Sequence, residues 1–195
     1  MLHRYDLVSS TTWTARATLT PSSNYRKSWS IAKDCNRVAV GDSSSNNRAE
    51  LYDYTASSDT WASSATINAL SNTDEFGSAV SLNDAGDVLA VGARSSNDPS
   101  DTSNTKHGAF VMYKLNSGSW EQLTDVVYGQ SDDARTGSMI AVSGDGMRVL
   151  VQSERNNAVY AGQGGCQLYY RQQTPTPNYI PVSYTHLRAH ETRIH

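Results

Sequence analysis

The sequence is poor in cysteine, in charge and in long apolar runs, and each shortage excludes a class of protein. Its only cysteines, Cys35 and Cys166, are too few and too far apart to predict a disulfide framework or a cysteine-based metal site. No run approaches the roughly 20 apolar residues that cross a bilayer, and the N-terminal segment lacks the apolar core of a secretory signal. A net charge of -3 with 18% charged residues argues against a phosphate-binding surface. We therefore expect no nucleic-acid partner and no membrane insertion.

What the chain does contain is a series of short apolar runs separated by Ser, Asn, Thr and Gly, which is typical of many short strands joined by turns. Three stretches align without gaps, and each predicts a strand, a tight polar turn and a second strand. They are Ser30–Gly41, Ser81–Gly92 and Ala141–Gln152. Self-similarity of this kind indicates a repeat architecture.

A second block recurs three times along the chain: a segment that ends in tyrosine, with a tryptophan seven or eight residues later. The pairs are Tyr5 and Trp13, Tyr54 and Trp61, and Tyr113 and Trp120. The tryptophans are 48 and 59 residues apart, and about 50 residues with four strands is the size of a propeller blade. Their fixed place in each unit favours packing at the blade edge over sugar binding.

The second strand of each aligned stretch lacks the alternation of a half-exposed strand. The runs are Val38–Val40, Val88–Val91 and Val149–Val151. Such runs are expected in sheets that are covered on both faces. The sequence therefore predicts an all-β fold, a partial β-propeller with about three four-stranded antiparallel blades plus partial blades. We expect an open arc, because about four to eight blades are needed to close a ring and this chain has too few.

The repeat also divides the chain. Residues 1–24 are expected to be the end of a partial blade, and residues 25–75, 76–135 and 136–180 are expected to be blades, the last one truncated. Residues 181–195 show neither the repeat nor a strand pattern, and Val182–Thr192 resembles translated sequencing-adapter sequence. We expect this tail to be non-native and disordered, so the spacing of His186 and His190 is not interpreted as a zinc site.

The middle unit resembles the FG-GAP repeat, the blade of integrin α-subunit propellers. The resemblance is carried by Phe76-Gly77, by Val88–Ala93 with Gly92, and by Gly108–Tyr113 followed by Trp120, with Arg94 in place of the family's proline. It implies a non-enzymatic binding or adhesion module of a cell-surface or secreted protein that recognises protein or glycan. The first turns are too short and too poor in carboxylates for the calcium site of integrin blades, so no metal and no cofactor is expected.

Two alternatives stay open beside adhesion: a glycan-active hydrolase built on a propeller, and a structural spacer. A hydrolase would need carboxylates and arginines that converge near the central axis. No catalytic residue is singled out by the repeat, and the single histidines His3 and His107 are expected to be solvated. The long polar loop that contains Asp98, Asp101 and Asn104 is the candidate for binding a partner.

Overall fold

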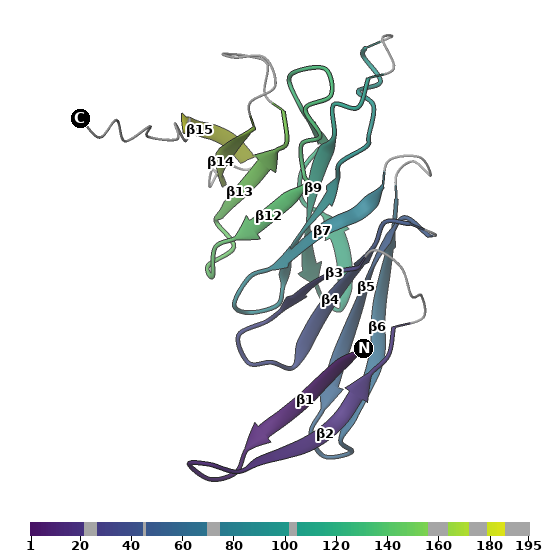
Figure 1. Ribbon diagram of the computed structural model, residues 1–195, viewed down its shortest axis with the longest axis vertical. Helices are drawn as coiled ribbons and strands as arrows, with labels where there is room; N and C mark the ends of the chain where they lie inside the picture. The colour runs from purple at the N-terminus through teal and green to yellow at the C-terminus, as the bar shows by residue number, and fades with distance from the viewer. Residues whose placement is uncertain are drawn as a thin grey trace, which may run out of the picture.

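The computed structural model describes residues 1–21, 27–44, 46–69, 75–101, 105–155, 164–171 and 179–185, which form antiparallel sheets that follow one another along the chain (Figure 1). The first sheet is a hairpin of β1 (Leu2–Leu7) and β2 (Trp13–Leu19). The described part of the chain contains no helix with the length and apolarity needed to span a membrane.

Three larger sheets come next, and in each the strands pair in chain order from one edge to the other. The first consists of β3 (Lys27–Ile31), β4 (Arg37–Asp42), β5 (Arg48–Thr55) and β6 (Thr60–Asn68). The second consists of β7 (Phe76–Leu82), β8 (Val88–Ala93), β9 (Ala109–Asn116), β10 (Ser119–Gln122) and β11 (Val127–Tyr128), with both β10 and β11 on β9. The third consists of β12 (Met139–Val142), β13 (Arg148–Ser153), β14 (Gly165–Arg171) and β15 (Tyr179–Thr185).

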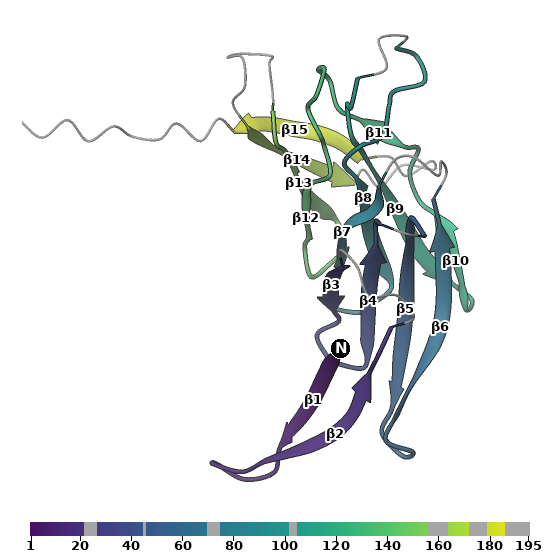
Figure 2. The same ribbon diagram turned by 45° about the vertical axis from the view of Figure 1, so that its right-hand side comes forward.

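The sheets stack face to face, and their first strands lie along one side of the stack. Strand β7 contacts β3 and β4 of the preceding sheet, and β12 contacts β7 and β8. The first strands β3, β7 and β12 therefore form the inner edge of an arc that does not close (Figure 2). The all-β partial propeller with an open arc that the sequence predicts is confirmed.

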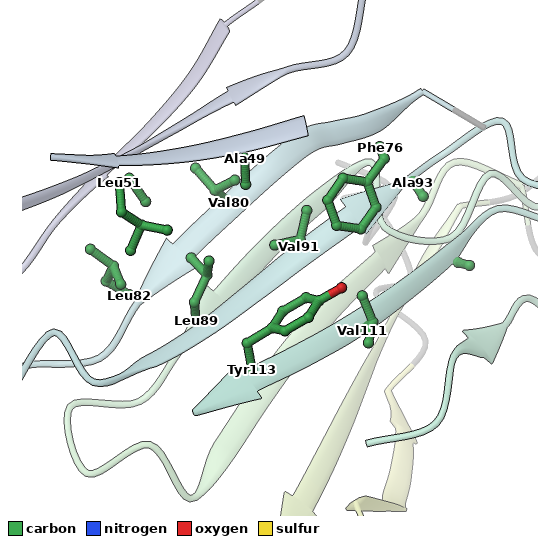
Figure 3. Close-up of a cluster of buried hydrophobic side chains, with 12 residues drawn as sticks. Ala49, Leu51, Phe76, Val80, Leu82, Leu89, Val91, Ala93, Val111 and Tyr113 are labelled. Atoms are coloured by element: carbon green, nitrogen blue, oxygen red, sulfur yellow. The ribbon is translucent and has the colours of Figure 1, made fainter. Parts of the chain in front are cut away.

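The three apolar runs occupy equivalent places, in the second strand of each sheet, and their alternate side chains pack in opposite directions. In β8, Leu89 and Val91 join a buried cluster with the preceding sheet, whereas Val88 and Ala90 join one with the following sheet. Figure 3 shows the first of these clusters, in which side chains of β5 meet those of β7, β8 and β9. Because both faces of β8 are covered, its sequence needs no polar alternation.

Glycine permits the close approach of successive sheets at two equivalent points. A Cβ atom on Gly41 would lie 2.1 Å from the carbonyl oxygen of Gly77, and one on Gly92 would lie 2.1 Å from that of Gly137. Gly77 and Gly137 have φ values of +89° and +86°, which L side chains rarely adopt. Gly77 and Gly92, two glycines of the sequence signature, therefore lie at the contacts between successive blades.

Serine hydroxyls repeat at the same two contacts. Ser30 Oγ accepts a hydrogen bond of 2.9 Å from the Leu82 backbone N–H, and Ser81 Oγ accepts one of 2.9 Å from Val142. These hydroxyls satisfy amide groups on the free edges of β7 and β12, which have no ladder partner on that side.

The tyrosines and tryptophans of the repeat are not equally buried. Tyr54 and Tyr113 are buried and Trp61 and Trp120 are half-buried, but Trp13 is 63% exposed. Trp61 packs against Tyr54 in a tilted arrangement, with 5.2 Å between the ring centroids and 51° between the ring planes. Trp13 lies at the start of β2 in the two-stranded sheet, which offers less apolar surface than the larger sheets.

Strand β15 extends past Pro181, where the sequence predicts no strand, and its backbone pairs with β14 from Tyr179 to Thr185. The expectation that no strand follows Pro181 is therefore wrong for residues 181–185. Backbone pairing does not require a side-chain pattern, because an exposed strand edge offers N–H and C=O groups to any extended segment. His186, His190 and the rest of the tail lie outside the described residues.

Candidate functional site

Four charged residues gather where the inner strands of two neighbouring sheets end. Glu75 directly precedes β7 and Arg94 directly follows β8, and the pairing of Phe76 with Ala93 brings both to the same end of that hairpin. Arg135 and Glu154 occupy the corresponding places beside β12 and β13 in the next sheet. Because the two sheets stack along their inner edges, the four side chains meet there.

The four side chains form a chain of alternating charge. Arg94 Nε donates to Glu75 Oε2 at 2.5 Å, and Arg94 Nη1 lies 3.7 Å from Glu154 Oε1 in the next sheet. Glu154 Oε2 in turn accepts from Arg135 Nη1 at 3.2 Å. The hydrogen bond that Arg94 donates to Glu75 raises the pKa of Arg94 above its ordinary value, so this guanidinium stays charged. Each side chain keeps between 25% and 36% of its surface exposed, which leaves the group open to a ligand.

The backbone at this place is strained in the same way in both sheets. Glu75 and Arg135 have φ values of +54° and +50°, a region that non-glycine residues enter at a cost of about 1–3 kcal/mol. Strain of this kind is common at functional sites because it aims a side chain that a relaxed backbone would direct elsewhere.

One donor of the group has no partner. Arg135 Nε is buried and makes no hydrogen bond, although the same guanidinium contacts Glu154 through Nη1. A buried donor without an acceptor costs about 1–3 kcal/mol. Two guanidinium groups beside two carboxylates can bind an anionic or polyhydroxylated ligand, hold negative charge that develops on an oxygen, and accept a proton.

Sequence reasoning missed all four residues, although the repeat carried a signal for them. In the gap-free alignment, Glu75 corresponds to Arg135, and Arg94 corresponds to Glu154. The ion pair is thus present in two successive units with its charges exchanged. Because the residue identities differ at each position, a search for recurring residues does not find it.

The loop predicted to bind a partner lies between β8 and β9. Asp98 Oδ1 accepts hydrogen bonds from the Ser100 hydroxyl at 2.7 Å and backbone N–H at 2.8 Å, which lower the pKa of Asp98. Asp101 lies beside His107, and Asn104 lies outside the described residues. His3 is exposed as expected, but His107 is only 6% exposed, so its predicted solvation is wrong. It is buried because its ring packs between this loop and the segment after β11.

An open pocket of about 640 Å³ adjoins His107. It lies between the loop that follows β8 and the segment around β11. Its lining consists of Asp98, His107 and residues 125–130.

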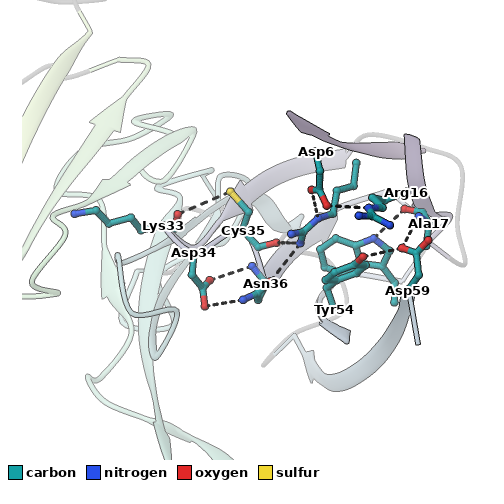
Figure 4. Close-up of polar contacts among 11 residues, drawn as sticks. Asp6, Arg16, Ala17, Lys33, Asp34, Cys35, Asn36, Tyr54 and Asp59 are labelled. Carbon is teal, nitrogen blue, oxygen red and sulfur yellow. Dashed lines mark hydrogen bonds and ion pairs between the residues drawn. The ribbon is translucent and has the colours of Figure 1, made fainter. Parts of the chain in front are cut away.

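The aspartate that follows β5 has a structural role. Asp59 Oδ1 accepts a hydrogen bond of 2.7 Å from the Tyr54 hydroxyl and one of 3.0 Å from the backbone N–H of Ala17 in β2 (Figure 4). The hydrogen bond from Tyr54 lowers the pKa of Asp59. Arg4 of β1 also lies over the Tyr54 ring, 3.9 Å from its centroid. These contacts attach the β1–β2 hairpin to the next sheet.

No protein-family model matches the chain, and the search of curated proteins finds no match. Solved structures do match. One from Bacteroides uniformis, provisionally assigned as a 6-phosphogluconolactonase, has a TM-score of 0.57 and 12% identity, with 90% of this chain and 47% of that chain covered. A second from Bacteroides fragilis, with the same provisional assignment, has a TM-score of 0.57 and 11% identity over 94% and 51%. The periplasmic gluconolactonase of Pseudomonas aeruginosa has a TM-score of 0.52 and 16% identity over 93% and 50%.

These comparisons support the propeller fold, and the chain spans about half the length of the structures it matches. They correct the resemblance to FG-GAP repeats and the non-enzymatic adhesion function drawn from it, because these three similar structures carry the name of a lactonase, two of them provisionally. The resemblance misled because its residues are ones that stacked blades need in general. Gly77 and Gly92 serve the contact between sheets, and Val88–Val91 fills two interfaces.

Proposed function

We propose that this chain is part of a β-propeller hydrolase that opens sugar lactones, with its chemistry at Glu75, Arg94, Arg135 and Glu154. The observation that carries the proposal is the position of this group, at the inner edge of the arc and contributed by two sheets. Arginines and carboxylates that converge near the axis are what the hydrolase alternative requires. The likeness to lactonase-type structures supports the choice of substrate class.

The reaction assigns a role to each kind of side chain. Water adds to the lactone carbonyl carbon and gives up a proton to Glu154, and the carbonyl oxygen takes the negative charge. Arg135 stabilises that oxyanion through the exposed part of its guanidinium group. The ring C–O bond then breaks, the ring oxygen takes the proton back from Glu154, and the product acid loses a proton to solvent. Arg94 and Glu75 bind the hydroxyl groups of the sugar.

The test is the hydrolysis of D-glucono-1,5-lactone by the full chain, followed as proton release above the rate in buffer. We expect Glu154→Gln to lower kcat by a factor of about 10² or more, because it removes the proton acceptor. Arg135→Gln should lower kcat by a similar factor of about 10², because it removes an oxyanion donor.

Strand β13 offers matched controls at its opposite end. Asp145 and Arg148 form an exposed ion pair of 3.3 Å there, so Asp145→Asn and Arg148→Gln remove the same kinds of charge away from the site. Both controls should keep the full rate. The proposal is wrong if the chain neither accelerates lactone hydrolysis nor binds gluconate saturably, or if Glu154→Gln is as active as Asp145→Asn.

A further inference from the structure

A buried histidine and two aspartates meet beside the charged group described above, where the Arg135 backbone N–H donates to the carbonyl oxygen of Lys106 at 3.2 Å. His107 Nε2 lies 3.1 Å from Asp101 Oδ2 and 3.7 Å from Asp132 Oδ1. One ligand atom from each residue lies within 4.8 Å of the others. The three residues come from two segments, the loop after β8 and the segment between β11 and β12.

The hydrogen bonds of His107 decide which ring nitrogen faces the aspartates as a lone pair. His107 Nδ1 lies 3.0 Å from the backbone carbonyl oxygen of Thr105, which can only accept, so Nδ1 carries the proton. In the neutral ring, Nε2 then presents a lone pair to two carboxylates. One imidazole nitrogen and two carboxylate oxygens that converge in this way are a donor set that a metal ion accepts.

The surroundings have the features of the outer sphere of a metal site. A metal-binding histidine usually donates its second N–H to a carbonyl or carboxylate, as His107 does to Thr105. The hydroxyl of Thr105 also donates to Asp132 Oδ1 at 3.0 Å and orients that carboxylate. The two segments are joined beside the site by the hydrogen bond from Thr136 N–H to the His107 carbonyl, 3.0 Å long. The ligands are therefore held in place without the metal.

We propose that Asp101, His107 and Asp132 bind one divalent cation of the zinc class. A site of one imidazole and two carboxylates suits a transition metal of this kind, whereas calcium prefers six to eight oxygen ligands. Three protein ligands leave a fourth position of a tetrahedral ion open. His107 also lines the pocket of about 640 Å³, so that position is available to water or a small ligand. The proposal does not depend on the proposed hydrolase function.

The test is titration of the full chain with Zn²⁺ by calorimetry, and with Co²⁺ by visible absorption, which reports coordination directly. We expect one site, with the intense visible bands of tetrahedral Co²⁺. His107→Gln and Asp132→Asn should each weaken binding by at least about tenfold, the loss that even an outer-sphere change causes. Asp132 is 63% exposed, so its substitution leaves the fold intact even if His107→Gln does not.

Two controls separate this site from other metal-binding groups. Asp98→Asn changes a carboxylate of the same pocket that is not one of the three ligands, and it should bind Zn²⁺ as the unchanged chain does. The double substitution His186→Gln and His190→Gln removes the histidine pair of the tail and should also have no effect. The proposal is overturned if the tail variant abolishes binding, if His107→Gln and Asp132→Asn bind like Asp98→Asn, or if no Zn²⁺ binds.

Discussion

At the scale of single residues, the contact between blades depends on glycines that cannot be replaced by a larger residue without a clash. Gly41 and Gly92 occupy the same place in β4 and β8, and each faces a carbonyl oxygen of the next sheet at a distance that leaves no room for a methyl group. The facing oxygens belong to Gly77 and Gly137, which also accept hydrogen bonds from Ser28 and Ser78. A side chain on either glycine would push apart two sheets whose shared core is made of buried side chains.

Gly92→Ala should therefore destabilise the protein by about 3 kcal/mol, the upper part of the usual range for overpacking, because a backbone carbonyl cannot rotate away. Gly41→Ala should have a similar effect at the equivalent contact. Urea unfolding followed by tryptophan fluorescence measures both. Gly118 is the control, because its added Cβ would meet nothing within 4 Å and only its φ of +88° opposes alanine, at about 1–2 kcal/mol. Equal losses at Gly92 and Gly118 would contradict the packing explanation.

The sequence was sufficient to predict where these glycines stand in the repeat, but not the reason for them. Gly92 aligned with Gly41, and Phe76-Gly77 aligned with Thr136-Gly137. That alignment identifies positions without saying which sheet a residue faces. The charged group was harder to predict, because the acidic and basic residues change places between the two units. Glu75 and Arg94 form the ion pair in one unit, and Arg135 and Glu154 form it in the next.

At the scale of elements, the β1–β2 hairpin is attached to the next sheet through Asp59, whose pKa is lowered by the hydrogen bond from Tyr54. A carboxylate with a lowered folded-state pKa contributes stability above the pKa of the unfolded chain, about 3.9, and loses it as the pH falls through the folded value. Asp59→Asn should therefore be less stable than the unchanged chain at pH 7. The difference should shrink below about pH 4.

Urea unfolding at pH 7, 4 and 2.5 measures this dependence, and hydrogen exchange of β2 amides locates it at the hairpin. Tyr54→Phe removes the donor and should abolish most of the additional loss caused by Asp59→Asn, since the two groups act as one pair. A difference between Asp59→Asn and the unchanged chain that stays constant from pH 7 to pH 2.5 would exclude an ionised Asp59 as the cause.

The elements themselves differ in how far they could be predicted. Strands β4, β8 and β13 could be predicted because continuous apolar runs are rare elsewhere in the chain. Both faces are buried in β4 and β8, whereas β13 is buried on one face and exposes Leu150 on the other. Strand β11 was not predicted, because its two residues pair with β9 after a break that has no turn signature. Strand β15 was not predicted either, because it forms by pairing with the free edge of β14 and its own sequence has no strand pattern.

At the scale of the whole molecule, the open arc leaves large apolar side chains exposed at each end. Trp29 and Ile31 of β3 are 37% and 48% exposed on the face that looks toward the β1–β2 hairpin. At the other end Met139 and Leu150 are 65% and 41% exposed, on the face of β12 and β13 opposite the core side chains Val149 and Val151. In a closed propeller, both faces would be covered by neighbouring blades.

These two faces predict that the chain self-associates in a concentration-dependent way, since exposed apolar patches of this kind drive aggregation. Light scattering from dilute to concentrated solution measures the effect. Met139→Lys combined with Ile31→Lys places a charge on each face at an exposed position and should reduce the association without lowering the midpoint of urea unfolding by much. Substituting Tyr5 and Val8 with lysine is the control, because these exposed side chains lie on the hairpin and not on the inner strands. A chain that stays monomeric at high concentration, or that responds equally to both pairs of lysines, would show that the sheet faces at the ends of the arc are not what drives association.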